Sequence, residues 1–155
     1  MTDIVSPEER SQLMSKIRGT DTLIEKKVRS NLHGRGYRFR KCVAGLPGRP
    51  DIVLPKFKAV IFIHGCFWHG HADCRKSRLP ATRRIFWEEK RKSNVERDTR
   101  KVTELLNKRW RVAIVWQCVI EKRDIFISTM DALERWIQTG SRYFEIPAKV
   151  DLLNN

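Results

Sequence analysis

The chain has 155 residues, 41% of them hydrophobic, which is enough for one domain with a single core. It carries 32 Lys and Arg against 18 Asp and Glu, and this net charge of +14 is typical of a protein with a polyanionic partner, most often nucleic acid. The first twenty residues lack the apolar region of a signal peptide, and the longest apolar run, residues 59–63, is far shorter than the roughly 20 residues of a membrane span. We therefore expect a cytoplasmic protein whose four cysteines are metal ligands or reduced thiols.

Hydrophobic periodicity and capping residues predict alternating helices and strands. Ser6 and Glu9 form a capping box that begins an N-terminal helix, and Thr20 or Asp21 caps a second helix that Gly34 ends. The further predicted elements are, in chain order, a strand over 37–42, a hairpin of strands 51–54 and 59–64, a helical region over 83–108 that is either continuous or divided near 93–94, a strand over 111–116 and a helix over 124–139. These helices around three or four strands indicate an α/β or α+β sandwich, with a tail over 141–155 to which no role is assigned.

Residues 62–74 concentrate three of the four histidines and two of the four cysteines in one irregular segment. Together with a later cysteine, they offer the thiolate and imidazole donors that suit tetrahedral zinc, at Cys66, His71, Cys74 and Cys118. On spacing alone His69 could replace His71, and Cys42 is taken as an ordinary strand residue. The alternative without a metal is a set of buried free cysteines beside surface histidines.

An aspartate opens a predicted strand in the segment Gly48-Arg-Pro-Asp51. A Pro-Asp pair in this position resembles the first half of the PD-(D/E)xK nuclease motif, in which the carboxylate holds Mg²⁺ beside the scissile phosphate. The next predicted strand carries neither the acid nor the lysine of that motif, so His64 and His69 would have to take or give the proton. A turn aspartate that accepts local backbone hydrogen bonds is the simpler alternative.

Basic and aromatic residues alternate in the middle of the chain. Residues 75–101 hold eleven Lys and Arg against four Asp and Glu, half of the excess charge, and Phe86-Trp87 interrupts them. Cations can contact phosphates, and rings can stack on bases or between base pairs. The alternative is a solvated helix face with rings in the core, although at least one of Phe67 and Trp68 is expected to point outward.

Several segments, in order and with matching spacing, resemble the very-short-patch-repair (Vsr) mismatch endonucleases of bacteria. The resemblance covers roughly residues 8–120 and lies in Leu46-Pro-Gly-Arg-Pro-Asp51, His64-Gly-Cys-Phe-Trp-His69, Pro80-Ala-Thr-Arg83, Phe86-Trp87, Asn94-Val-Glu-Arg-Asp98, Trp110-Arg-Val and Trp116-Gln-Cys118. It implies one domain over residues 1–155 with a DNA-contacting helix over 1–20. The implied fold is restriction-endonuclease-like, with a central mixed β-sheet flanked by helices and a structural zinc site.

The resemblance also implies an activity: Mg²⁺-dependent nicking of duplex DNA on the 5′ side of the T in a T:G mismatch. Such mismatches arise when 5-methylcytosine deaminates, and the nick begins very short patch repair. The implied partners are double-stranded DNA with a T:G mismatch, mismatch-repair proteins and a companion cytosine methyltransferase. We expect a monomer in the bacterial cytoplasm, associated with the nucleoid.

Carried over position by position, the resemblance assigns roles to individual residues. It implies that Asp51 is the principal Mg²⁺ ligand and that His69 is the general base. His64 would lie at the scissile phosphate, oriented by Asp98, and Glu25 would hold metal-bound waters. The implied zinc ligands are Cys66, His71, Cys74 and Cys118. The implied intercalating residues are Phe67, Trp68 and Trp87 from the major groove and Met14 from the minor groove.

Two positions depart from the family pattern. Ile63 stands where a threonine can occur, so a metal contact there would have to use the backbone carbonyl. The segment His71-Ala-Asp-Cys74 is one residue longer than in some relatives, and we expect Asp73 to bulge outward.

Two other functions compete with a nuclease. A non-catalytic, zinc-stabilised DNA-binding module explains the charge and the cysteines but leaves Asp51, His64 and His69 without a task. A zinc hydrolase of small molecules needs an open coordination position on the zinc.

Overall fold

The computed structural model describes residues 22–41 and 43–148, and its centre is a four-stranded mixed sheet in the order β1-β2-β3-β4. The first two strands pair antiparallel, and β2, β3 and β4 run parallel to one another. The strands are β1 (Ile52–Leu54), β2 (Ala59–His64), β3 (Arg111–Trp116) and β4 (Tyr143–Ile146).

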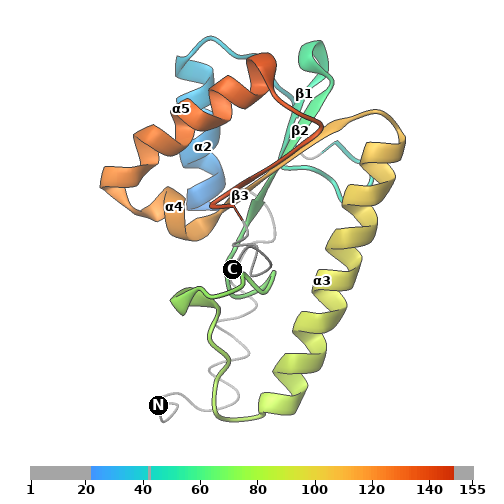
Figure 1. Ribbon diagram of the computed structural model, residues 1–155, viewed down its shortest axis with the longest axis vertical. Helices are drawn as coiled ribbons and strands as arrows, with labels where there is room; N and C mark the ends of the chain where they lie inside the picture. The colour runs from blue at the N-terminus through green and yellow to red at the C-terminus, as the bar shows by residue number, and fades with distance from the viewer. Residues whose placement is uncertain (1–21, 42, 149–155) are drawn as a thin grey trace, which may run out of the picture.

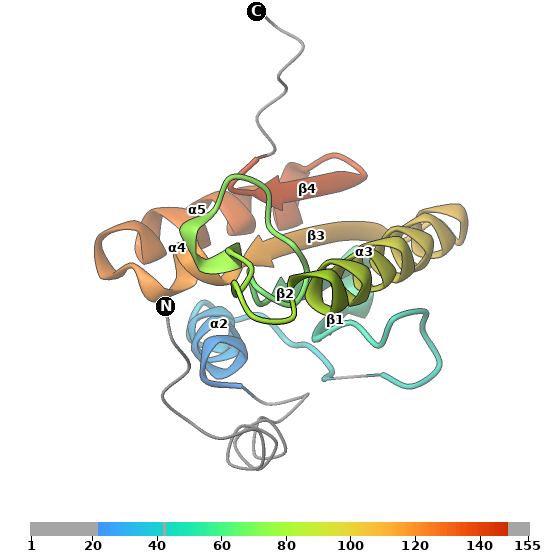
Figure 2. The same ribbon diagram turned by 90° about the horizontal axis from the view of Figure 1, so that it is seen from below.

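Helices cover both faces of this sheet, which confirms the predicted α/β class. One face carries α2 (Leu23–Gly34), α4 (Gln117–Glu121) and α5 (Arg123–Thr139), whereas the long α3 (Arg84–Asn107) lies on the other face (Figure 1). The view along the layers shows the sheet between these two groups (Figure 2). Short 3₁₀ turns cover Pro55–Phe57 and Arg75–Ser77. None of the described helices combines the length and the apolar composition that a membrane span requires.

β1, β2 and most of β3 read as apolar runs because both faces of this part of the sheet are buried. In β2, Ile61 and Ile63 belong to the core cluster on the side of α2 and α5, whereas Val60 and Phe62 belong to the cluster that includes Leu105 of α3. Every residue of β2 is buried. The sheet therefore separates two cores, and a one-residue slip of β2 would move each side chain into the wrong one.

The predicted strand over 37–42 is wrong for the described residues, which form only an isolated bridge between Arg40 and Val53. The alternation of rings and cations reflects burial of Tyr37 and packing of Phe39 against the core, without a ladder. The three residues of β1 are too few to support a longer pairing. Cys42 and the predicted N-terminal helix lie outside the described residues.

The remaining elements follow the prediction with three differences. The helix over 83–108 is continuous, because the side chain of Asn94 donates to the Trp68 carbonyl and does not compete for its own backbone. The cap of α2 is Thr22, which follows the two residues predicted for it. Neither α4 nor β4 was predicted. β4 is the fourth strand of the sheet and lies in the segment 141–155, to which the sequence analysis assigned no role.

The guanidinium of Arg111, the first residue of β3, binds the C-terminal end of α5. It donates hydrogen bonds to the carbonyls of Trp136 (2.9 Å) and Ile137 (2.8 Å) and lies over the Trp136 ring. These carbonyls are among those that a helix end leaves without an intrahelical donor. Arg111 therefore connects the C-terminal end of α5 to the start of β3.

Replacing Arg111 with leucine should lower the free energy of unfolding by about 2–3 kcal/mol, because the carbonyls lose charged hydrogen bonds at a partly buried site. Urea denaturation would measure the change. Arg135→Leu, on the exposed side of α5, is the matched control and should shift stability by less than about 0.5 kcal/mol. Equal shifts in the two variants would show that the contact with α5 has no special importance.

Candidate active site and metal centre

The candidate site lies where β2 and β3 end in register. His64 of β2 is the partner of Trp116 of β3, so the loop after β2 and helix α4 leave from the same edge of the sheet. The antiparallel β1 begins at this edge, because Ile52 pairs with Ile61. Two segments that are distant in sequence, together with Asp51, are therefore collected at one place.

Four soft ligands meet at this edge: Cys66, His71, Cys74 and Cys118, whose donor atoms all lie within 4.8 Å of one another. His71 Nδ1 is 3.5 Å from the sulfur of Cys66 and 3.6 Å from that of Cys118. Tetrahedral zinc with ordinary Zn–S and Zn–N bonds would place a nitrogen about 3.6 Å from each sulfur. The spacing therefore fits a closed metal site, with His71 in the set and His69 outside it.

The surroundings of the four donors complete this site. The amide of Cys66 donates to Gln117 Oε1, and the buried hydroxyl of Ser77 bonds to the carbonyls of His71 and Cys74. Burial raises the pKa of the Cys66 thiol to about 12, so a bound cation is what would hold this sulfur as a thiolate. Asp73 is exposed and has a φ of 57°, so its side chain lies on the outside of the loop, as expected.

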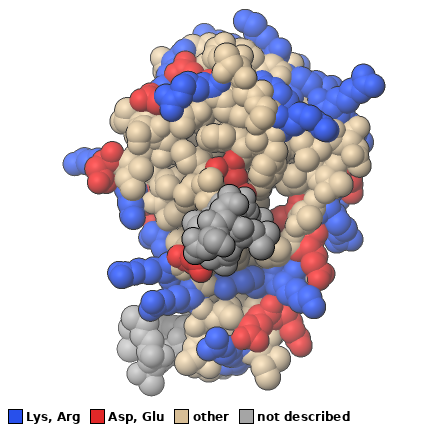
Figure 3. Space-filling view, in the orientation of Figure 1, with Lys and Arg blue, Asp and Glu red and all other residues tan. Residues whose placement is uncertain are grey.

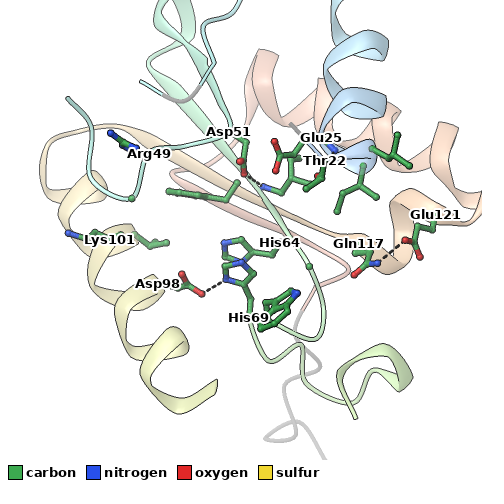
Figure 4. Close-up of a pocket in the computed structure, with 18 residues that line it drawn as sticks. Thr22, Glu25, Arg49, Asp51, His64, His69, Asp98, Lys101, Gln117 and Glu121 are labelled. Atoms are coloured by element: carbon green, nitrogen blue, oxygen red, sulfur yellow. Dashed lines mark hydrogen bonds and ion pairs between the residues drawn. The ribbon is translucent and has the colours of Figure 1, made fainter. Parts of the chain in front are cut away.

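A cavity of about 680 Å³ opens beside the four donors. Its polar lining comes from α2, the segment before β1, the end of β2, the following loop, α3 and α4 (Figure 4). The lining residues with titratable or amide side chains are Glu25, Arg49, Asp51, His64, His69, Asp98, Lys101, Gln117 and Glu121.

The carboxylate of Asp51 is fixed at the floor of the cavity. Its Oδ2 accepts a hydrogen bond of 2.6 Å from the amide of Ile63, beyond the last residue pair of β1 and β2. Burial raises the pKa of Asp51 to about 7. The hydrogen bond from Ile63 lowers this pKa, and the charge of nearby Glu25 raises it. Glu25 is itself 4% exposed and pairs with buried Arg29 at 3.4 Å. One buried and one partly buried carboxylate thus face the same cavity, an arrangement that a cation would stabilise.

The two histidines stack face to face. Their ring centroids are 3.8 Å apart with an angle of 4° between the planes, and His69 Nδ1 donates to Asp98 Oδ2 at 2.6 Å. Among the described residues, buried His64 Nδ1 has no hydrogen-bond partner. Burial, with a smaller contribution from His69, lowers the pKa of His64 well below its usual value, so its imidazole is neutral at physiological pH.

The expectation that Asp98 orients His64 is corrected by this geometry, because Asp98 bonds to His69. The donor atoms of His64, His69 and Asp98 also lie within 4.8 Å of one another. Imidazole lone pairs lie in the ring plane. Parallel stacked rings therefore direct their lone pairs side by side, and they cannot converge on one ion. This triad suits proton transfer better than metal binding.

One face of α3 contacts the loop after β2 at intervals of seven and four residues. Trp87 packs against Phe67 and Trp68, Asn94 donates to the Trp68 carbonyl, and Asp98 binds His69. The three rings form a half-buried cluster with centroids 5.1–6.1 Å apart. The structure thus gathers Phe67, Trp68 and Trp87, whereas Met14 lies outside the described residues.

Sequence reasoning missed several residues that line the cavity. Arg49 stands in the segment that was examined only for Asp51, and Lys101 lies one turn after Asp98. Gln117 precedes Cys118, and its side chain links Cys66 to Glu121 through hydrogen bonds. Nothing in the residue pattern distinguishes these side chains from solvated surface, because their role depends on the register of β2 and β3.

Lys and Arg surround this region of the surface. In the space-filling view, blue side chains form a band across the lower half of the face and lie along its flanks (Figure 3). The charge of +7 over residues 75–101 belongs to the end of the loop and most of α3. Such a surface attracts a polyanion toward the cavity.

Comparison with known proteins identifies this arrangement. Residues 2–76 match the family model described as DNA mismatch endonuclease Vsr. The chain is 45% identical over 139 residues to the DNA mismatch endonuclease Vsr of Escherichia coli K12, with 88% of each protein covered. It is 52% identical over 118 residues to the type II nicking enzyme V.XorIIP of Xanthomonas oryzae, which covers 76% of this chain and 86% of that protein.

A third relative, the type II nicking enzyme V.NmeAIP of Neisseria meningitidis, is 42% identical over 138 residues and covers 89% of this chain and 98% of its own. Similarity of this degree over nearly the whole length extends well beyond the cavity and its ligands. The chain therefore belongs to the Vsr family of DNA mismatch endonucleases and is a DNA endonuclease.

Proposed function

We propose that this endonuclease nicks duplex DNA on the 5′ side of the T in a T:G mismatch left by deamination of 5-methylcytosine, and so begins very short patch repair. The observation that carries the proposal is the convergence of the Asp51 carboxylate and the His64–His69–Asp98 group in one cavity. A bound metal ion and a base that acts on water are two components with which an enzyme can hydrolyse a phosphodiester. The names of the relatives, a mismatch endonuclease and nicking enzymes, support the substrate and the single-strand cut.

Mg²⁺ is the proposed catalytic ion, with Asp51 as its principal ligand. In an extended strand the N–H and C=O of one residue point to the same edge, so the Ile63 carbonyl faces the side on which its amide binds Asp51. Carboxylate and carbonyl oxygens are the donors that Mg²⁺ prefers, and Glu25 would act through metal-bound water. When bound, the ion would neutralise charge on the phosphate and on the leaving 3′ oxygen.

His69 is the proposed general base. Asp98 holds the Nδ1 proton of His69, so Nε2 is left to take a proton from the attacking water. His64 is neutral and buried, with one N–H to offer a phosphate oxygen at the same site.

The four soft donors are proposed to hold structural zinc. Four protein ligands close the coordination sphere, so the ion would brace the loop and perform no chemistry, which disfavours a zinc hydrolase of small molecules. The braced loop carries Phe67 and Trp68, which we propose enter the duplex at the mismatch together with Trp87 from the major groove, with Met14 entering from the minor groove. A T:G pair deforms at lower cost than a Watson–Crick pair, so wedging rings would select for it.

The remaining features follow from the same resemblance. We propose a restriction-endonuclease-like fold, one domain over residues 1–155 with a DNA-contacting helix over 1–20, and a monomer. DNA as the substrate supports a location in the bacterial cytoplasm, at the nucleoid, and mismatch-repair proteins are proposed as partners.

Asp51→Asn should bind a T:G duplex with affinity close to wild type and fail to nick it in Mg²⁺, because the amide cannot hold the cation. Gel assays on duplexes that differ only in T:G or C:G at one pair measure cutting, and fluorescence anisotropy measures binding. Glu89→Gln, an exposed carboxylate on α3, is the control and should cut normally. Full nicking by Asp51→Asn would remove Asp51 from the mechanism, and equal cutting of both duplexes by wild type would refute the proposed substrate.

His69→Ala should lower the nicking rate at saturating DNA by about 10²- to 10⁴-fold, the usual contribution of a general base. Asp98→Asn should also slow nicking, because the amide no longer holds His69 in one tautomer. Glu96→Gln on the same helix is exposed and should leave the single-turnover rate unchanged. A normal rate in Asp98→Asn would show that its hydrogen bond to His69 has no part in proton transfer.

The purified protein should contain one zinc per chain, and Cys118→Ser should lose the metal and much of its stability. Replacing zinc with Co²⁺ should produce the charge-transfer absorption of cobalt thiolates. Cys42→Ser is the matched thiol control and should retain both metal and absorption. Retention of metal by Cys118→Ser would contradict the proposed ligand set.

A further inference from the structure

Arg91 of α3 is a half-buried cation, and two of its three guanidinium nitrogens have no hydrogen-bond partner among the described residues. Its guanidinium carbon lies 5.4 Å from the centroid of the Phe67 ring, within the range of a cation–π contact. Among the described residues, none forms a hydrogen bond with Nε or Nη2, although both atoms are buried. Buried guanidinium nitrogens are almost always satisfied, so this pair of donors requires an explanation.

The chain itself holds Arg91 in this position. At Gly70, whose φ is 64°, an added Cβ would lie 2.8 and 2.9 Å from Cδ and Cγ of Arg91. The loop therefore approaches the arginine stem so closely that only glycine fits both the space and the backbone angle. The guanidinium is confined between α3 and the aromatic cluster.

None of the described residues that line this confined space offers a carboxylate to the guanidinium. The gap is lined by Phe67, Trp68, Leu79, Trp87, Lys90, Arg91 and Asn94, without an acidic residue, and has a volume of about 10 Å³. That volume is no larger than one water molecule needs. Burial also lowers the pKa of Arg91, as expected for a cation without a counter-charge. An acceptor can reach Nε and Nη2 only if the rings move apart and something from outside enters.

We propose that Arg91 is a DNA-contacting residue of mismatch recognition: when the aromatic cluster opens on the duplex, its guanidinium leaves Phe67 and donates to an acceptor of the DNA beside the deformed pair. This inference rests on the proposed function, since it requires that Phe67, Trp68 and Trp87 enter DNA. The acceptor is a phosphate oxygen or a base-edge oxygen or nitrogen, the groups that an arginine fork binds. Because the cluster stays closed on a regular duplex, the contact forms on mismatched DNA.

The test compares Arg91→Met with Lys92→Met in the full-length, metal-loaded protein. Methionine keeps an unbranched stem against Gly70 and removes the charge, and Lys92 is an exposed cation next in sequence. Affinity is measured in the Asp51→Asn background, which prevents cutting, on duplexes that carry T:G or C:G at one pair. Urea denaturation checks that both variants are folded.

We expect Arg91→Met to weaken binding of the T:G duplex about tenfold or more relative to the C:G duplex. Lys92→Met should weaken binding of both duplexes by the same factor. Equal losses on both duplexes in Arg91→Met, or none, would overturn the inference. If the parent protein itself does not prefer T:G to C:G, it is the proposed substrate that fails.

Modified duplexes then identify the acceptor. Methylphosphonates beside the mismatch remove phosphate acceptors, and 7-deazaguanine opposite the T removes the N7 acceptor of the base. The loss of affinity caused by Arg91→Met should disappear on one of these two duplexes, and that duplex identifies the acceptor as the phosphate or as the base edge. Persistence of the full loss of affinity on both duplexes would show that neither these phosphates nor guanine N7 is the acceptor, and would count against the inference.

Discussion

The parallel register of β2 and β3 is the constraint on which the site depends. Because His64 and Trp116 are partners, the two strands end together, and the segments that follow them bring Cys66 and Cys118 to the same edge. Trp116 serves both sides of the site, since its ring stacks on His71 at 4.2 Å and meets His64 edge-on at 5.2 Å. The antiparallel β1 adds Asp51 at this edge. No single segment contains the site, and the sheet assembles it.

The uniform buried pattern of the central strands made the architecture predictable. β2, β3, the β1–β2 hairpin and α5 follow directly from apolar runs and their breaks. The prediction of a strand over 37–42 was wrong because alternate residues, here Tyr37 and Phe39, can pack against the core without a ladder of backbone hydrogen bonds. β4 was missed because its four residues are only partly buried and obtain their strand character from pairing with β3.

The candidate site was predictable in its residue types and less so in its pairings. The close sequence spacing of the cysteines and histidines indicated both a metal site and a proton-transfer group, and the donor spacing now separates His71 from His69. The partner of Asp98 could not be read from sequence, because it depends on which face of α3 meets the loop. Arg49, Lys101 and Gln117 became visible only when three elements closed around one cavity.

The burial of like charges is what distinguishes this cavity from ordinary surface. Glu25 is buried and Asp51 is partly buried, and burial raises the pKa of Asp51, so a cation in the cavity would stabilise the charged form of this carboxylate. His64 is kept neutral by the same burial. Ionisable groups whose pKa values are shifted by burial are common where a protein is organised for chemistry.

Helix α3 also sets a length scale for the enzyme. Trp87 and Asp98 lie on one face of this uninterrupted helix, eleven residues apart, which corresponds to about 16 Å along its axis. About five base pairs of B-form DNA cover the same length. The helix thus fixes the distance between the aromatic cluster and the His64–His69–Asp98 group. Leu105, which is buried near the C-terminal end of the helix, packs it against the sheet. Lengthening or shortening this helix by one turn would change the distance between the rings that are proposed to distort DNA and the group that is proposed to cut it.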